Sequence, residues 1–226
     1  MTARLEIIVG PMFSGKTELL IAKLHRAQYA KKRIRILKPA HDARTQGFIA
    51  SRAVNADGTT DITDKLSAVM VRSEQDFLRA VGPADFDVLA VDEAQFFPLD
   101  EPMRDTLGWF GRAIRALLRE RRQTHLRIII AGLDMDFAEN PFGPIPGLLA
   151  IADQVEKLTG VCMVCGSDDG YISHRIIPGE QQLVVGDVGE YQVRCRACYE
   201  PPGVRSASVF ARGADGKPSA AAGAKG

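Results

Sequence analysis

Short apolar runs alternate with amphipathic stretches along the first two thirds of the chain. The apolar runs predict strands at residues 5–9, 34–37, 68–71, 88–91 and 127–131. The run at 88–91 is apolar throughout, which is typical of a strand covered on both faces. Helical patterns lie between the runs, at about residues 18–30, 74–81 and 101–122. This alternation predicts an α/β fold, a parallel sheet with helices on both faces.

Polar segments divide the rest of the chain. Residues 39–64 are rich in Asp, Thr and Gly and predict a long loop that could act as a lid, and residues 132–147, with three prolines, predict a second long loop. Beyond residue 153 the pattern changes to short β-like pieces, and the last 26 residues are mainly Ala, Gly, Ser, Pro and charged residues. We therefore expect an α/β domain at 1–153, a smaller domain at 154–200 and a disordered tail at 201–226.

Composition narrows the class of protein. The chain has 226 residues, of which 46% are hydrophobic and 25% charged, with a formal net charge of +1. These values are typical of a globular protein with a core and give no overall electrostatic attraction to nucleic acid or membranes. No apolar run approaches the ~18 residues of a membrane span, and the first residues do not resemble a secretory signal. We expect a cytoplasmic protein whose partners include neither nucleic acid nor membrane.

A phosphate-binding motif follows the first strand directly. Its residues are Gly10, Pro11, Met12, Phe13, Ser14, Gly15, Lys16 and Thr17, in the P-loop pattern. Glycines let successive backbone N–H groups point at phosphate oxygens, and the start of the next helix adds partial positive charge. Lys16 would reach the β- and γ-phosphates of a nucleotide, and the Thr17 hydroxyl would bind Mg²⁺. The alternative is a glycine-rich turn with a solvent-exposed lysine.

Two adjacent carboxylates, Asp92 and Glu93, follow the apolar run at 88–91. The carboxyl ends of strands are where α/β sheets bind ligands. Asp92 would hold the hydrated Mg²⁺, and Glu93 would act as general base or position the nucleophile. The alternative is that both are acids stabilised by the dipole at the start of a helix.

All four cysteines lie in the last third of the chain, as two C-x-x-C pairs. They are Cys162, Cys165, Cys195 and Cys198. Four thiolates at this spacing are enough for a tetrahedral structural Zn²⁺ site, and a reducing compartment favours metal over disulfides. The alternatives are two inert reduced pairs or a redox switch.

Several longer segments together resemble one family. They are GPMFSGKTELL, VDEAQFF, GLDMDF, PFGPIPGLL, KLTGVCMVCG and EYQVRCRACY, spread over about residues 4–200. These segments resemble the thymidine kinases of the small tetrameric type. The resemblance implies a P-loop ATP-binding α/β domain, a zinc-binding lasso domain, and ATP-dependent phosphorylation of the 5′-hydroxyl of thymidine, with deoxyuridine also plausible. It further implies a homotetramer and inhibition by thymidine triphosphate.

The resemblance also assigns roles to individual positions. It implies that the Gly10–Thr17 backbone and Lys16 cradle the phosphates, that Arg52 approaches the phosphoryl groups, and that Glu93 is the catalytic base. Asp57-Gly58 competes with Arg52 for its place. The residues it places around the nucleoside are Gln95, Phe96, Phe97, Phe137, Phe142 and Tyr191.

Two features depart from the family pattern. Asp187 stands where the family usually has the second of two glycines, and glycine reaches positive φ more easily than aspartate. Arg112, Arg115, Arg119 and Arg122 fall at helical spacing, which indicates a solvated helix face or a subunit contact.

Two other classes of function fit parts of the sequence. Asp92 and Glu93 lie in a segment that also resembles the acidic motif of ATP-driven nucleic-acid enzymes, but the length leaves room for only one P-loop domain. A zinc-ribbon binding module with a structural nucleotide would leave Glu93 and the lasso without a role.

Overall fold

The computed structural model describes residues 2–40, 47–54, 60–82, 85–100, 105–177 and 189–202. Its elements are β1 (Arg4–Val9), α1 (Lys16–Tyr29), β2 (Ile34–Pro39), β3 (Phe48–Val54), β4 (Thr60–Ser67), β5 (Val69–Val71), α2 (Glu74–Val81), β6 (Val88–Val91), the 3₁₀ helix η1 (Ala94–Phe96), α3 (Gly108–Glu120), β7 (Arg127–Gly132), α4 (Ile145–Ile151), β8 (Gln154–Lys157), β9 (Ile172–Arg175) and β10 (Tyr191–Arg194).

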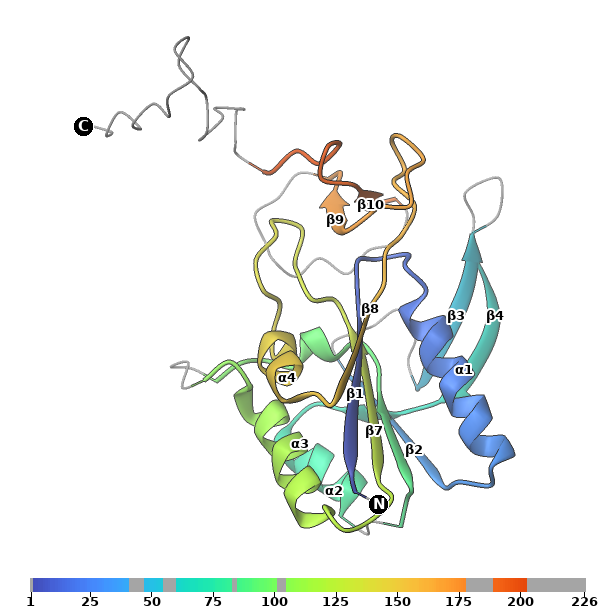
Figure 1. Cartoon of the computed structure of the whole chain (residues 1–226), viewed down its shortest axis with the longest axis vertical. Coiled ribbons are helices and arrows are strands. Elements are labelled where there is room, and N and C mark those ends of the chain that lie inside the picture. The colour runs from blue at the N-terminus through green and yellow to red at the C-terminus, as the bar shows by residue number, and fades with distance from the viewer. Residues whose placement is uncertain are drawn as a thin grey trace, which may run out of the picture.

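Six parallel strands form the central sheet, in the order β5-β2-β6-β7-β1-β8 (Figure 1). The first strand in the chain therefore lies inside the sheet, where Ile7 is opposite both Ile130 of β7 and Val155 of β8. Because all six strands run the same way, their carboxyl ends meet along one edge. That edge carries the loop after β1 and the acidic pair after β6.

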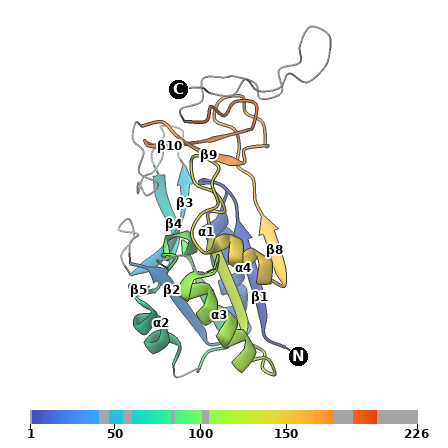
Figure 2. The ribbon, with the colours of Figure 1, turned by 90° about the vertical axis from the view of Figure 1, so that its left-hand side faces the viewer.

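Different helices cover the two faces of the sheet, α1 on one face and α2, α3 and α4 on the other (Figure 2). On one face, Ile8 and Ile129 pack in a core with Leu20 and Leu24 of α1. On the other face, Ile7, Ile130 and their neighbours pack with α2, α3 and α4, where Phe110 is fully buried. The predicted α/β class, with helices on both faces of a parallel sheet, is confirmed.

The segment predicted as a long loop at 39–64 contains most of an antiparallel hairpin instead. β3 and β4 pair from Phe48↔Ser67 to Val54↔Thr60, with an irregularity between Ser51 and Arg52. Among the hairpin side chains that the structure describes, Ile49 alone is fully buried, in the core beneath α1, and Leu66 packs against the same core. So few apolar positions explain why the hairpin does not stand out in the sequence. Residues 41–46 and 55–59 of the predicted lid lie outside the described residues.

The arginine-rich helix starts later than its apolar spacing predicts. It begins at Gly108 and not at residue 101, because the Asp105 carboxylate accepts hydrogen bonds from the N–H groups of Leu107 and Gly108, and Gly108 itself has φ +58°. The predicted loop at 132–147 is likewise shortened by α4. In α3, Arg112 forms ion pairs with Asp100 and Asp105, which precede the helix.

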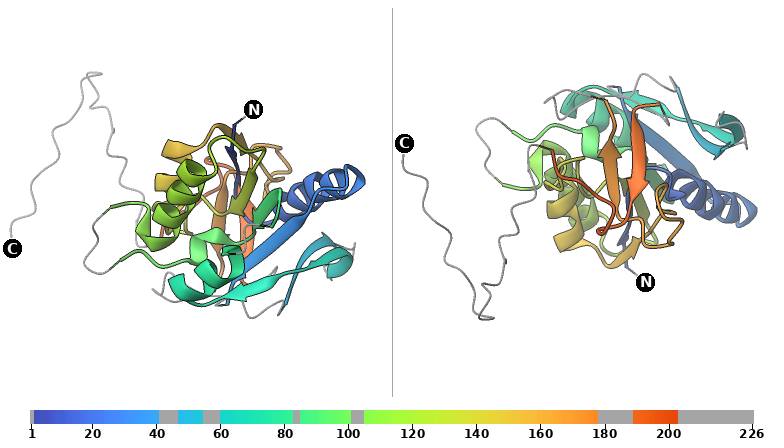
Figure 3. Two further views of the ribbon diagram at one scale, coloured as in Figure 1. Left: turned by 90° about the horizontal axis from the view of Figure 1, so that it is seen from below. Right: turned by 90° about the horizontal axis from the view of Figure 1, so that it is seen from above.

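Beyond the sheet, β9 and β10 pair antiparallel in a small lobe above the carboxyl ends of the strands (Figure 3, right). β8, just past residue 153, belongs to the sheet, whereas Gly160 and Gly170 form a bridge at the base of the lobe. We call residues 158–177 and 189–200 the cysteine lobe. The predicted tail from residue 203 onward lies outside the described residues.

Within the described residues, no helix is both long enough and apolar enough to cross a membrane.

Candidate active site

The loop between β1 and α1 has the backbone that a phosphate cradle needs. Gly10 has φ +146°, and a Cβ there would lie 2.5 Å from the carbonyl oxygen of Leu158. Gly15 has φ +79° immediately before α1 begins. Lys16 curls back over the loop and donates a hydrogen bond to the Pro11 carbonyl. The motif therefore has the strand–loop–helix setting that phosphate binding requires.

Asp92 is brought to this loop by β6. Its carboxylate is 4% exposed and accepts a hydrogen bond from the Thr17 hydroxyl at 3.0 Å. Burial, followed by the negative charge of Glu93, raises the pKa of Asp92 to about 7, although Lys38 and the Thr17 hydrogen bond act in the opposite direction. A cation bound here would offset the cost of burying the carboxylate. Thr17 and Asp92 are thus the pair that could hold a metal ion.

Glu93 is held in an unusual conformation by the next residues. Its φ is +55°, in the left-handed region that costs a non-glycine residue about 1–3 kcal/mol and that is typical of functional sites. The Gln95 side-chain amide donates to Glu93 Oε2 at 2.6 Å and accepts a hydrogen bond from the Leu133 N–H at 3.0 Å. Gln95 is 2% exposed, so both ends of its amide are used inside the protein. It fixes the carboxylate of Glu93 in one place.

The two phenylalanines after Gln95 point to different parts of the molecule. The Phe96 ring meets the Phe142 ring edge to face, with 6.0 Å between centroids. Phe97 is 2% exposed and stacks on Phe110 at 4.0 Å, inside the core between the sheet and α3. The structure therefore brings Phe96 and Phe142 together and separates Phe97 from them.

Phe137, in the loop after β7, packs against the cysteine lobe next to Arg175 and Tyr191. The Arg175 guanidinium lies over the Phe137 ring, 3.6 Å from its centroid, and Tyr191 is opposite Arg175 in the β9–β10 pair. The Tyr199 hydroxyl donates to the Phe137 carbonyl at 2.7 Å. Burial raises the pKa of Tyr199 to about 12, which keeps this donor protonated. These contacts fasten the loop after β7 to the lobe.

The four cysteines converge as their spacing predicts. Their sulfur atoms all lie within 4.8 Å of one another, and those of Cys165 and Cys195 are 3.8 Å apart. Thiolates about 2.3 Å from a tetrahedral Zn²⁺ are separated by about 3.8 Å, so the cluster fits zinc. Hydrogen bonds from backbone N–H groups lower the pKa of Cys162 to about 6, which favours its thiolate form.

Known proteins resemble this chain over most of its length. Residues 3–199 match the model of the thymidine kinase family. The chain belongs to this family. A thymidine kinase of Bacteroides thetaiotaomicron is 39% identical over 215 residues, which cover 95% of this chain and 91% of that protein. One of Bacteroides fragilis is 38% identical over 87% of both chains, and one of Porphyromonas gingivalis (strain W83) is 38% identical over 86% of this chain and 84% of its own.

Family membership confirms the resemblance seen in the sequence and makes the chain a nucleoside-phosphorylating enzyme. The four-cysteine cluster is consistent with the zinc lasso of that resemblance. The match of residues 3–199 to the thymidine kinase family favours nucleoside phosphorylation over the two other functions, a nucleic-acid-dependent ATPase and a zinc-ribbon binding module.

Four residues of the site, Lys38, Ser173, Arg175 and Tyr199, were not predicted from the sequence. Lys38 directly follows the apolar run at 34–37 and is the last but one residue of β2; it is 2% exposed, and its positive charge lowers the pKa of Asp92. A charged residue after a buried strand is the same signal that identifies Asp92, and could have identified Lys38. Ser173 accepts a hydrogen bond from the Met12 N–H at 2.9 Å, and Tyr199 holds Phe137; both contacts span long stretches of sequence and leave no local signal.

Arg52 lies on β3, beside the irregularity in its pairing with β4. Asp57 and Gly58, the alternative positions for the role of Arg52, lie outside the described residues. Asp187, which departs from the family pattern, also lies outside them.

Proposed function

We propose that the enzyme transfers the γ-phosphoryl group of ATP to the 5′-hydroxyl of thymidine and also accepts deoxyuridine. One observation carries this proposal: the Thr17 hydroxyl at the start of α1 is bonded to Asp92, and Glu93 is the next residue. A phosphate cradle, a carboxylate for a metal ion and a carboxylate for the nucleophile therefore occupy one edge of the sheet.

The phosphates of ATP would lie on the Gly10–Thr17 backbone, with Lys16 turning from Pro11 toward the β- and γ-phosphates. Mg²⁺ that enters with ATP would neutralise phosphate charge, and Thr17 and Asp92 are the residues placed to hold it. Arg52 of the hairpin would approach the phosphoryl groups from the side of α1.

Glu93 would take the proton of the 5′-hydroxyl as the oxygen bonds to phosphorus and the bond to the ADP leaving group breaks. Gln95 supports this role by holding Glu93 Oε2, and does so from a buried position where it has no surface left for the nucleoside. Gln95 is therefore a positioning residue in this proposal.

Phe96, Phe142, Phe137 and Tyr191 would enclose the nucleoside between the loop after β7 and the cysteine lobe. Zinc in the four-cysteine cluster would hold the two arms of the lobe together and take no part in phosphoryl transfer. Thymidine triphosphate, which can span the nucleoside site and the P-loop at once, is proposed as a feedback inhibitor, because linking two sites raises affinity. We also propose that the enzyme is a homotetramer and acts in the cytoplasm.

The test is transfer of label from γ-labelled ATP with thymidine, deoxyuridine, other nucleosides and single-stranded DNA as separate acceptors. We expect labelled monophosphate with thymidine and deoxyuridine and no ATP consumption stimulated by DNA. Transfer that fails with both pyrimidine nucleosides would overturn the proposal. Adding thymidine triphosphate to the same assay tests inhibition, which should be relieved by excess thymidine.

A further inference from the structure

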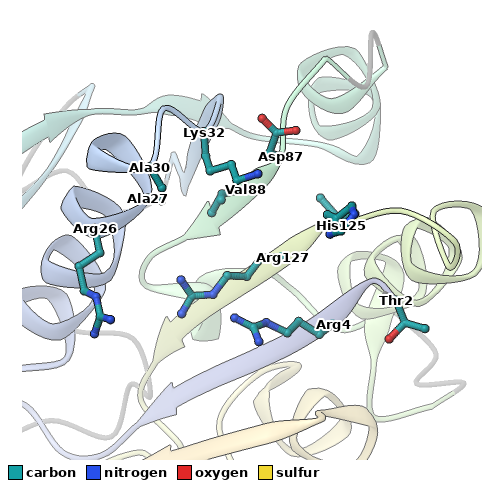
Figure 4. Close-up of a pocket in the computed structure, with 11 residues that line it drawn as sticks. Thr2, Arg4, Arg26, Ala27, Ala30, Lys32, Asp87, Val88, His125 and Arg127 are labelled. Carbon is teal, nitrogen blue, oxygen red and sulfur yellow. The ribbon is translucent and has the colours of Figure 1, made fainter.

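A basic hollow of about 530 Å³ lies at the opposite end of the sheet from the P-loop (Figure 4). It is formed where β1, β6 and β7 begin and where α1 ends. Four cationic side chains line it, Arg4, Arg26, Lys32 and Arg127, against one carboxylate, Asp87. Neither the P-loop nor the cysteine lobe contributes to it.

The carboxylate of Asp87 is already engaged from outside the hollow. It accepts hydrogen bonds from the backbone N–H of Arg33 at 2.9 Å and from the Arg33 guanidinium at 3.3 Å. Arg33 does not line the hollow, so its charge cancels that of Asp87 and leaves the four cations in excess.

A second carboxylate, Glu6, lies beneath the hollow and is shared among too many cations to neutralise them. Glu6 is 2% exposed and forms ion pairs with Arg127, Arg4 and Lys23. The Arg127 pair is bidentate, at 2.5 and 2.6 Å, whereas Arg4 contacts Glu6 through Nε at 3.0 Å and keeps 56% of its side chain exposed. One negative charge thus fixes the orientation of two guanidinium groups without cancelling their charge.

The remaining two cations face these guanidinium groups. In Figure 4 the side chains of Arg4 and Arg127 point toward α1, which carries Arg26, and Lys32 follows the end of that helix. Across the part of the chain that the structure describes, Arg26 has no acidic partner. The floor between the cations is apolar, with Ala27, Val88 and Leu126 all buried.

We propose that this hollow binds a phosphate-bearing anion, the phosphate chain of a nucleotide or an inorganic polyphosphate. Converging guanidinium groups match phosphate oxygens in charge and in geometry, and two of them are fixed in place by Glu6 before any ligand arrives. The apolar floor provides a surface that a nucleoside attached to the phosphates would cover. Since the P-loop lies at the other end of the strands, both sites can be filled at once.

The experiment uses the full chain with Lys16→Ala, which weakens phosphate binding at the P-loop. Inorganic tripolyphosphate is titrated calorimetrically without magnesium at about 0.15 M salt, where loose surface attraction is screened. A second chain adds Arg26→Ala and Lys32→Ala, both exposed positions with no part in the catalytic site. The matched control adds Arg119→Ala instead, an exposed arginine of α3 on the other face of the sheet.

We expect one tripolyphosphate per Lys16→Ala chain, an affinity at least about tenfold lower when Arg26 and Lys32 are replaced, and no change with Arg119→Ala. ATP in place of tripolyphosphate separates the two sources: tighter binding of ATP means that the floor takes the nucleoside, and equal binding means that the phosphates alone are recognised. No binding to the Lys16→Ala chain, or an affinity that is insensitive to Arg26 and Lys32, overturns the proposal. Melting temperatures of all chains establish that they are folded.

A charge reversal in the otherwise unaltered enzyme gives an independent test. Arg26→Glu should abolish the second tripolyphosphate site and leave nucleoside phosphorylation without added polyphosphate unchanged. Two sites of unaltered affinity in this variant would also overturn the proposal.

Discussion

The phosphate end of the sheet and the cysteine lobe face each other across the candidate site, but different forces hold them. Two large cores support the strands that carry the P-loop and the acidic pair. The lobe has few buried apolar side chains, chiefly Ile172, Tyr191 and Val193, against an ordering cost of about 1–2 kcal/mol per residue. Small units of this kind need a metal or a disulfide. A change at the sheet end should therefore alter chemistry with the fold intact, and a change in the lobe should alter folding and binding together.

The largest effect is expected at the sheet end. Glu93→Gln keeps the size of the side chain and removes its ability to accept a proton, so kcat should fall by about 10²–10⁴ with little change in ATP affinity. Steady-state kinetics measure kcat and the KM for ATP, and a thermal melt shows whether the fold is intact. A Glu93→Gln enzyme with near-normal turnover would refute the role of Glu93, and a large drop in melting temperature would refute the contrast between the two regions.

The lobe should respond in the opposite manner. Cys162→Ser removes one of four thiolates, and because structural zinc supplies about 10–16 kcal/mol to small folds, the lobe should lose its metal and its order. We expect no bound zinc, a thymidine KM raised about tenfold or more, and a smaller loss of ATP affinity. The Met12–Ser173 hydrogen bond is lost with the lobe, but the sheet still supports the P-loop. Met163→Ala is the matched control, because Met163 is exposed and lies between Cys162 and Cys165. Full activity in reducing buffer without zinc would contradict this account.

The hydrogen bond between the Met12 N–H and Ser173 joins the phosphate loop to the cysteine lobe, and removing it should give an intermediate effect. Ser173→Ala leaves the Met12 N–H without its acceptor, at a cost of about 1–3 kcal/mol if no water replaces it. Both substrates should bind more weakly, since the bond connects the phosphate loop to the lobe. Ser173→Thr keeps a hydroxyl and should restore the affinities. If the alanine variant weakened thymidine binding alone, the bond would not couple the two regions.

The smallest effect is expected at the β3–β4 hairpin, which is attached to α1 by an exposed ion pair. The Asp64 carboxylate, 2.7 Å from His25 Nε2, raises the pKa of His25 above its ordinary value of 6.5, helped by Gln28. A raised histidine pKa means that the contact stabilises fully below about pH 6.5 and is lost as the pH rises through the folded pKa. Exposed pairs are weak, so the protection factors of β4 amides, which are exchange rates divided by the intrinsic rate at each pH, should fall by only about two- to fivefold over this range. The His25→Gln variant should show no such pH dependence in β4. If the pH dependence remained in this variant, a group other than His25 would be responsible for it.

The sequence predicts the buried parallel strands and the site at their carboxyl ends much better than it predicts the β3–β4 hairpin and the edge strand β8, for physical reasons. Strands covered on both faces appear as apolar runs, and parallel strands place Gly10, Lys16, Asp92 and Glu93 at one edge wherever they lie in the chain. The hairpin escaped because it buries little more than Ile49, and β8 because its residues are mostly exposed.

Finer features of the site depend on geometry that a linear pattern does not carry. Phe96 and Phe97 are adjacent and equally aromatic, yet a left-handed turn at Glu93 and one turn of 3₁₀ helix direct one toward Phe142 and the other into the core. The hydrogen bonds of the Gln95 amide to Glu93 and to the Leu133 N–H are likewise set by the folded backbone, and no spacing in the sequence predicts them.

The position of β1 inside the sheet has a consequence for how the enzyme is made. The strand that leads into the P-loop is synthesised before the other strands of the sheet, but its neighbours β7 and β8 are more than a hundred residues further along the chain. Pairing over such separations is slow, and the Met12–Ser173 bond closes a loop of 161 residues. A nascent chain that ends before β7 lacks both strands that pair with β1. The loop between β1 and α1 is then not held in place, and we expect no ATP binding. Retention on immobilised ATP would therefore distinguish completed chains from truncated ones.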